Sequence, residues 1–227
     1  MRALRVEVAM FTVRGGRLET ALLRGRANTW RLPGMAVGSS GTLREAAEAA
    51  LAEETGVRHV ELEQLFTFDR EGGEGAAVTY LALLHAGAHP LAPGSEVVEV
   101  RWFSWDDIPE LPPDQAETLG YGRERLRAKA AYAPVAAQLV PGDFTISELQ
   151  GVYEAILGRQ LDARNFRRDL ISAGVVERLD RTRSGGPGRP ASLYRWSAGA
   201  EGFSVLAVER RLARALSGDE GTAYDAE

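Results

Sequence analysis

The chain has 227 residues, of which 44% are hydrophobic and 26% charged, and its formal net charge is −5. This composition is typical of a globular protein and excludes a mostly disordered or fibrous chain. Because there is no cysteine, disulfide scaffolds, thiolate metal sites and cysteine nucleophiles are excluded. No apolar run approaches the roughly 20 residues of a membrane span. The acid Glu7 lies where a signal peptide would have its apolar core. We therefore expect a cytoplasmic protein with no membrane partner.

Charge is distributed unevenly along the chain. Between residues 159 and 195 there are nine arginines and only four acids, although the whole chain is acidic. A basic block on an acidic chain indicates nucleic-acid binding through that block. The alternative is a solvated arginine-rich face.

The first 110 residues predict strands. Alternating apolar residues from Leu4 to Met10 predict a half-buried strand, and the Gly15-Gly16 pair predicts a turn into a second strand over 18–24. Three further strands are expected, over 60–69, 77–85 and 97–103.

Two helices are expected in this half. Thr42 and Glu45 have the spacing of a capping box, and Gly56 ends the helix that follows. A second, connecting helix is expected from about 114 to 132. The Pro141-Gly142 pair then marks a joint between two domains.

The segment from Leu32 to Val57 resembles the Nudix hydrolase box, G-x5-E-x7-R-E-U-x-E-E-x-G-U, in which U is aliphatic. The positions that match the box are Leu51, Glu53, Glu54, Gly56 and Val57. The positions that fail are Met35, Gly41, Ala49 and Ala50, in place of Gly, Glu, Arg and Glu. The strand pattern and the partial box together predict an α/β (α+β) Nudix-like domain over residues 1–140.

The failed positions remove the chemistry of the box. Nudix enzymes attack a pyrophosphate with water while Mg²⁺ or Mn²⁺ holds the phosphates, and such cations need several oxygen ligands. The family pairs a glutamate at position 50 with the one at position 54, on one helix face. Here position 50 is Ala50. Glu53 and Glu54 would hold Mg²⁺ only weakly, so we expect no catalytic residues, no metal site and no required cofactor.

The second half predicts a winged helix-turn-helix domain over residues 141–200. Thr145 and Glu148 form a capping box ahead of one helix, and Asp162 caps the next. Two strand-like runs with a basic, glycine-rich loop between them follow, at 175–179 and 191–196. Helix, helix and hairpin is the order of elements in a winged helix.

The second of these helices carries side chains suited to DNA. In a helix-turn-helix its first turns enter the major groove, where arginine pairs with guanine and asparagine with adenine. We expect DNA contacts from this helix through Arg164, Asn165, Arg167 and Arg168. The hairpin tip is expected to meet phosphate or the minor groove through Arg181, Arg183 and Arg189. The alternative is a solvated helix and a disordered loop.

Three segments, 144–158, 161–170 and 188–195, resemble the C-terminal domain of the Nudix-related transcriptional regulators of NAD metabolism. That family fuses a Nudix-like sensor to a winged helix, and the resemblance covers about residues 4–200. It implies a homodimeric repressor of NAD synthesis or salvage genes that binds a palindromic operator in double-stranded DNA and is released by ADP-ribose. The sensor of the family often keeps hydrolytic activity. The four failed positions of the Nudix box in this chain depart from that pattern.

The resemblance implies ADP-ribose or a related NAD-derived effector. Residues expected to bind it are Arg31, Gly34, Glu53, Glu54, Phe68 and Arg70. Arg31 and Arg70 would meet phosphate, and Phe68 would stack on adenine or else lie in the core with Phe66. Two other functions stay open: an active Nudix pyrophosphatase with an accessory winged helix, and a winged-helix regulator of an unrelated metabolite such as a sugar.

Lys129, on the connecting helix, is the only lysine in the chain. It is either a solvated cation or a regulatory residue that pairs with an acid or a ligand phosphate and couples the two domains. Acetylation would remove its charge. Over residues 201–227 we expect a helix near 203–216 and then an acidic tail. The dimer surface would be the sensor or this helix.

Overall fold

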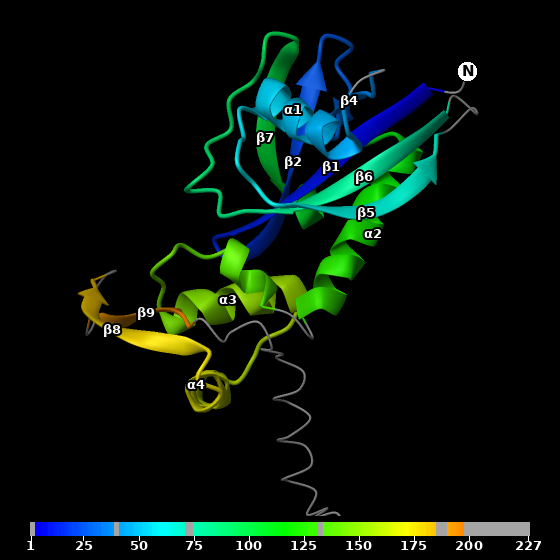
Figure 1. Ribbon diagram of the computed structural model, residues 1–227. Helices are drawn as coiled ribbons and strands as arrows, with labels where there is room; N and C mark the ends of the chain where they lie inside the picture. Colours follow the sequence, from blue (N-terminus) through cyan, green and yellow to red (C-terminus); the bar gives the residue numbers. More distant parts are fainter. Residues whose placement is uncertain (1–2, 39–40, 71–74, 131–133, 185–189, 198–227) are drawn as a thin grey trace, which may run out of the picture.

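The computed structural model describes residues 3–38, 41–70, 75–130, 134–184 and 190–197. Its upper part is built on a mixed sheet in which the strand order is β3-β2-β1-β6-β5, with β4 pairing with β1 and β7 with β2 (Figure 1). The strands are β1 (Ala3–Arg14), β2 (Arg17–Gly25), β3 (Trp30–Arg31), β4 (Gly34–Ala36), β5 (Leu62–Asp69), β6 (Gly75–Leu83) and β7 (Val97–Ser104). β1 and β6 are parallel, and the other pairs are antiparallel.

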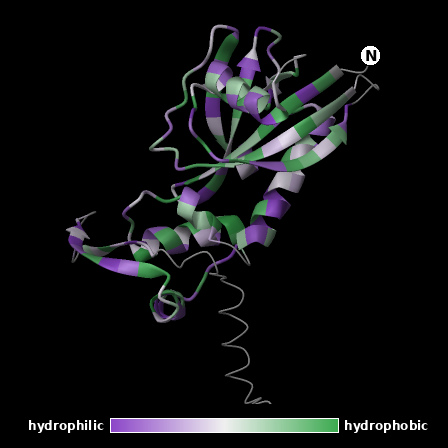
Figure 2. Cartoon of the chain, viewed as in Figure 1, coloured by the Kyte–Doolittle hydropathy of each residue, from purple (hydrophilic) through white to green (hydrophobic). Residues whose placement is uncertain are grey.

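Strand β1 is buried on both faces. Its even-numbered residues from Val6 to Met10 pack in one cluster with α1 (Leu43–Thr55), while Ala9 and Phe11 join a second cluster with α2 (Pro113–Ala130). Figure 2 shows hydrophobic residues along β1 and along its neighbour β6. The expectation of a half-buried strand is wrong, because helices cover the face that alternation assigned to solvent.

Both predicted capping boxes are present. The Thr42 side chain accepts a hydrogen bond from the Glu45 N–H, and the Glu45 carboxylate accepts one from the Thr42 N–H. Thr145 and Glu148 repeat this arrangement at α3 (Ile146–Leu157). The residues 131–132 at the end of the predicted connecting helix lie outside the described residues, as does the helix expected near 203–216.

The C-terminal part has the predicted winged-helix order. Helix α3 is followed by α4 (Ala163–Ser172), and strands β8 (Val176–Arg183) and β9 (Ala191–Trp196) pair antiparallel. Within the described residues, no helix combines the length and apolar character needed to span a bilayer.

The two parts share one hydrophobic core. A single cluster contains Phe11 of the sheet, Leu126 of α2, and Tyr153 of α3, and it continues into α4 and β9. At the expected joint, Leu139 and Val140 are buried in the same cluster. The segment before Pro141 is therefore packed between the two parts and is not a solvated linker.

The shared core predicts that the two parts unfold together. Leu126→Ala should destabilise the protein by about 2–5 kcal/mol, because it leaves a cavity in the core. Urea unfolding followed by far-UV circular dichroism and by tryptophan fluorescence should give coincident transitions. The matched control is Val98→Ala, because the Val98 side chain is 60% exposed. This substitution should change the free energy of unfolding by no more than about 0.5 kcal/mol. Two separate transitions in the parent protein would contradict the shared core.

Candidate functional site

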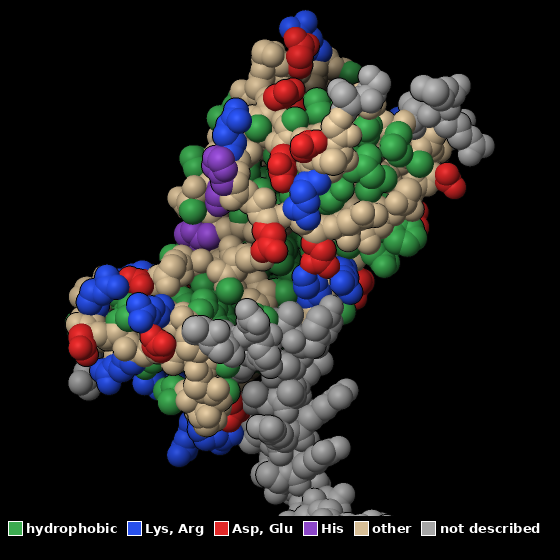
Figure 3. All heavy atoms as spheres, in the orientation of Figure 1, with side chains coloured by type: hydrophobic (Ala, Val, Ile, Leu, Met, Phe, Trp, Pro, Cys, Tyr) green, Lys and Arg blue, Asp and Glu red, His purple; other side chains and the backbone are tan. Residues whose placement is uncertain are grey.

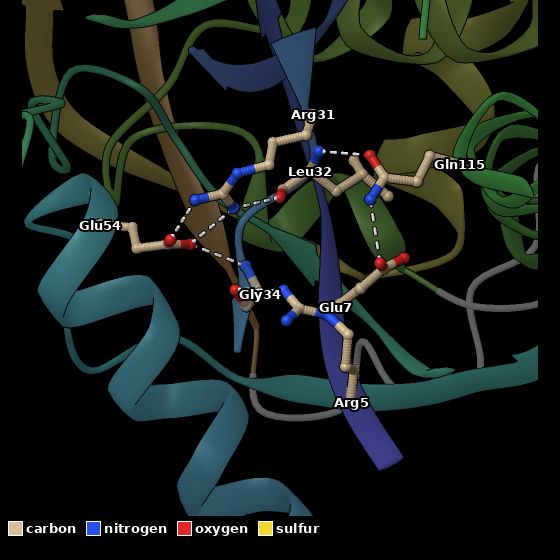
Figure 4. A network of polar contacts seen from close by, with 7 residues as sticks. All are labelled: Arg5, Glu7, Arg31, Leu32, Gly34, Glu54 and Gln115. Carbon is tan, nitrogen blue, oxygen red and sulfur yellow. Dashed lines mark hydrogen bonds and ion pairs between the residues drawn. The ribbon is translucent and has the colours of Figure 1, made fainter. Parts of the chain in front are cut away.

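Glu54, which matches the Nudix box, is held by two short strands (Figure 4). Arg31 on β3 donates hydrogen bonds of 2.5 and 3.3 Å to its two carboxylate oxygens. The N–H of Gly34 on β4 donates a third, of 2.8 Å. Arg31 thus supplies a cation beside this carboxylate although position 49, the arginine of the box, is alanine.

Strands β3 and β4 were not predicted, because two or three residues are too few for a periodic pattern. They nevertheless position the site. A Cβ on Gly34 would lie 2.4 Å from the Val6 carbonyl oxygen, so only glycine lets β4 approach β1 this closely. Arg5 adds a hydrogen bond of 3.1 Å to the Gly34 carbonyl.

Gln115 connects this site to helix α2. Its amide oxygen accepts a hydrogen bond of 2.9 Å from the Leu32 N–H, and its amide nitrogen donates one of 2.9 Å to Glu7 (Figure 4). Glu7 projects from β1 and is 2% exposed. The sequence pattern did not single out Glu7 or Gln115, because each lies next to the other only in the folded chain.

Burial raises the pKa of Glu7 above the ordinary glutamate value. The negative charge of Asp114 also raises it, while the Gln115 hydrogen bond and the charges of Arg5 and Arg70 lower it. Burial prevails, so the fold disfavours the ionised form of this carboxyl.

The other expected ligand residues are more widely spread. Arg70 directly follows β5, and its Nε lies 4.0 Å from Asp114 at the start of α2. Phe68 is half-buried beside Phe66 and Tyr121. Phe66 is 46% exposed and so does not lie in the core, while the stacking of Phe68 on adenine stays a prediction.

The residues at the box do not fit the magnesium site of the Nudix enzymes. Glu54 uses its carboxylate for Arg31 and Gly34, and Ala50 is fully buried. Glu53 is exposed. Among the described residues no group of three or more histidine or acidic side chains is placed to hold a metal ion, whereas Mg²⁺ requires several oxygen ligands.

The far end of α2 is also tied to other elements. Lys129 and Arg125 both pair with Glu63 on β5, so the partner of Lys129 is an acid. Burial raises the pKa of Glu63, but the hydrogen bonds from Lys129 and Arg125 outweigh it and bring the pKa below the ordinary value. Arg127 donates a hydrogen bond of 3.2 Å to the Ile156 carbonyl in α3.

Helix α4 has one buried and one basic face. The Asp162 side chain caps it by accepting a 2.7 Å hydrogen bond from the Asn165 N–H. Phe166 and Leu170 are buried, while Arg164 and Arg168 are exposed. Figure 3 shows arginines gathered at the outer end of α4 and over the β8–β9 hairpin.

Several of the predicted DNA-binding side chains have partners within the winged helix. Arg167 donates to the Tyr194 hydroxyl at 3.2 Å, and Arg168 pairs with its neighbour Asp169. Asn165 is half-buried.

Arg181 and Arg183 are not on the hairpin tip, because β8 continues to Arg183. Arg181 pairs with Asp143 at 2.7 Å, and Arg183 pairs with Glu148 at 2.7 Å and donates to the Asp143 carbonyl. These bonds attach β8 to the start of α3. Arg189 lies outside the described residues.

Comparison with known proteins agrees with both parts of the chain. Residues 3–121 match the NUDIX domain family, and residues 136–196 match the NrtR DNA-binding winged helix domain. A relative in Acinetobacter baylyi, the "ADPR responsive transcriptional repressor NtrR", is 32% identical over 208 residues, which cover 85% of this chain and 81% of the relative. The chain belongs to the NrtR family of Nudix-related transcriptional regulators.

Solved structures of the NrtR family extend the likeness. Shewanella oneidensis NrtR complexed with a 27mer DNA has a TM-score of 0.75 and 29% identity, covering 88% of this chain and 98% of that one. The NUDIX domain of the same NrtR, complexed with ADP ribose, has a TM-score of 0.51 and 25% identity, covering 56% of this chain and 89% of that one. The two-domain fold expected from the sequence is confirmed.

Glu7 predicts a specific pH dependence of stability. Because the pKa of Glu7 is higher in the folded than in the unfolded state, folding favours the protonated carboxyl. Its contribution to the free energy of unfolding is therefore full at low pH and is lost as pH rises through the folded-state pKa. Glu7→Gln cannot ionise. Its melting temperature should therefore rise relative to the parent once pH exceeds the unfolded-state pKa of about 4 and should level off above the raised folded-state pKa.

The control for Glu7 is Glu45→Gln. Hydrogen bonds from the Thr42 N–H and hydroxyl lower the pKa of Glu45. Its contribution to the free energy of unfolding is therefore present above the unfolded-state pKa and is lost as pH falls. The control variant should therefore be less stable than the parent at neutral pH. Thermal melts by circular dichroism across the pH series measure both differences. A Glu7→Gln difference that stays constant with pH would contradict the burial argument.

Proposed function

We propose that this protein is a homodimeric DNA-binding repressor whose Nudix-like domain senses ADP-ribose or a related NAD-derived ligand without hydrolysing it. The observation that carries the proposal is the environment of Glu54. The carboxylate that Nudix enzymes use toward metal is bound here by Arg31 and Gly34, and position 50 is a buried alanine. Binding and hydrolysis need different groups, so a sensor can keep the first and lose the second.

The geometry supports a route for sensing. A pyrophosphate entering beside Arg31 would compete with Glu54 for the guanidinium, which prefers bidentate anionic partners. Leu32, next to Arg31 in the chain, is bound through its N–H to Gln115 at the start of α2. Displacement of this segment would therefore act on α2 directly. Arg70, paired with Asp114 at the same helix end, is a second candidate phosphate partner.

The other end of α2 leads to the DNA-binding part. Arg127 bonds to the last turn of α3, while Lys129 and Arg125 bind Glu63 on the sheet. We assign Lys129 a coupling role, because it holds α2 against β5 at the point where the helix meets α3. Coupling free energies between such sites are typically about 1–3 kcal/mol.

The relatives supply the chemical identity of the partners. The Acinetobacter baylyi repressor is ADP-ribose responsive by its name, and the Shewanella oneidensis protein has been crystallised with DNA and its NUDIX domain with ADP ribose. Transferred to this chain, these partners predict a palindromic operator, because a two-fold dimer meets two half-sites about one helical turn apart. The regulated genes would be those of NAD synthesis or salvage.

ADP-ribose should release the protein from operator DNA and emerge unchanged. Fluorescence anisotropy of a labelled operator, titrated with ADP-ribose, measures the release. Chromatography of the ligand after incubation with Mg²⁺ or Mn²⁺ should find no AMP or ribose 5-phosphate, whereas an enzyme turns over about 1–10³ times per second. Turnover in that range would instead support a pyrophosphatase with an accessory winged helix.

The remaining alternative is a regulator of an unrelated metabolite. Calorimetric titration with ADP-ribose, NAD and a panel of sugars separates the two, because only a dinucleotide or its ADP-ribose part presents the pyrophosphate that Arg31 would bind. Heat from a sugar and none from ADP-ribose would exclude the proposed effector.

Arg164 should contribute to sequence discrimination. It is exposed near the start of α4, opposite the buried Phe166. Arg164→Ala should weaken operator binding by about 1–3 kcal/mol and weaken non-specific DNA much less. Arg58→Ala, at an exposed arginine of the sensor, is the control and should leave both unchanged. Equal losses on operator and random DNA would assign Arg164 to phosphate contact only.

A further inference from the structure

A cavity of about 490 Å³ lies where the sensor meets α3. We name it the interdomain cavity. Its sensor wall is formed by the β1–β2 turn, the short helix η2 (Trp105–Asp107) and α2, and its other wall is α3. It does not include Arg31 or Glu54 among its lining residues, so it is separate from the candidate ADP-ribose site. Its volume is within the range of small-molecule sites.

Arg123 is one of the charged residues that line this cavity. Its guanidinium stacks 4.3 Å from the centre of the Trp105 ring. Among the described residues its side chain has no hydrogen bond or ion pair, and its Nε is buried without a partner. Burial lowers the pKa of Arg123, and the charge of Arg127 lowers it further, against Glu124 and Asp106. An arginine held in this way lacks the anion that such groups normally bind.

Two more donors line the same cavity. Arg17, at the start of β2, is exposed, and across the described residues its side chain has no ion-pair partner. The hydroxyl of Ser104 is buried without a hydrogen bond, although Ser104 is in the N-cap position of η2.

The acids of the cavity offset these donors only in part: the negative charge of Asp106 acts on Arg123, but within the described residues the two form no ion pair. Glu154 accepts hydrogen bonds of 2.9 and 2.8 Å from Gln150 and from the Leu161 N–H, both in the winged helix. Asp106 is exposed. The charged lining residues are three arginines, Arg17, Arg123 and Arg159, and two acids, Asp106 and Glu154, and Arg159 has a partner of its own.

We propose that the interdomain cavity is a second effector site, which binds the phosphate group of a small metabolite between Arg123, Arg17 and Ser104. Two guanidinium groups and a hydroxyl match a phosphate, which presents several acceptor oxygens and about two negative charges. A ligand there would contact the sensor and α3 together. It would therefore bias the position of the winged helix independently of the ADP-ribose site, and the proposal does not depend on the identity of that first effector.

Calorimetric titration of the full chain with inorganic pyrophosphate tests the site. Because pyrophosphate would also bind at Arg31, the titration is done on the Arg31→Ala variant. Pyrophosphate should still bind to the interdomain cavity of this variant. Adding Arg123→Gln to that variant should weaken the affinity for pyrophosphate by about tenfold or more, as expected for the loss of a charge-assisted contact. The matched control is Arg26→Gln, an arginine that is 77% exposed on the sensor, and it should leave the affinity unchanged.

A second variant keeps the test valid if Arg123→Gln fails to fold. Ser104→Ala removes only a hydroxyl and should weaken pyrophosphate binding while melting close to the parent. Absence of binding in Arg31→Ala overturns the proposal, as does binding that Arg123→Gln and Ser104→Ala leave intact. Citrate that binds equally well with the same dependence on Arg123 would overturn the assignment to phosphate and indicate a carboxylate site. Ligand protection should also appear as a rise in melting temperature with pyrophosphate concentration.

Discussion

The sensor is built around β1, which is covered on both faces. Its residues alternate between two faces, and both faces are covered: α1 lies on one, and α2 with α3 on the other. The cluster on the second face runs without interruption from Phe11 through Leu126 to Tyr153. Burial of apolar surface at about 25 cal/mol per Å² is the dominant favourable term of such an arrangement. It also means that the DNA-binding part cannot reorient freely, because its first helix is part of the sensor's own core.

The polar network at the edge of the sheet depends on the same strand. Glu7 is carried by β1 toward α2, and Gly34 allows β4 to lie against β1. Glu54, Arg31, Leu32 and Gln115 then form one connected set of hydrogen bonds. Buried polar groups are costly when unpaired, so a change in the pairing of Arg31 with Glu54 affects a set of bonds that reaches from β3 to α2. The network therefore joins strands β3 and β4 to helices α1 and α2.

Arginines of the winged helix hold its own elements together. Arg181 and Arg183 bind acids at the start of α3, and both pairs are at least partly exposed. Exposed ion pairs contribute little, about 0–1 kcal/mol, so these two pairs cost little to break. Arg164 is exposed and free of such pairs on α4 among the described residues, which separates its expected role from theirs.

The sequence by itself determined the elements with local signals. The capping boxes at Thr42 and Thr145, the cap at Asp162 and the partial Nudix box were all readable, because the groups that interact lie within a few residues of one another. The order of helices and hairpin and the resemblance of these segments indicate the family without any knowledge of tertiary contacts.

Only the tertiary structure decided which distant residues meet. Gln115 joins Glu7 and Leu32 across 108 and 83 positions of the chain, and no periodic pattern encodes such a contact. The burial of both faces of β1, the pairing of Lys129 with Glu63, and the attachment of Arg183 to Glu148 depend likewise on packing. Alternation along a strand reports which residues share a face, but whether that face meets water or a second layer is decided by the rest of the chain.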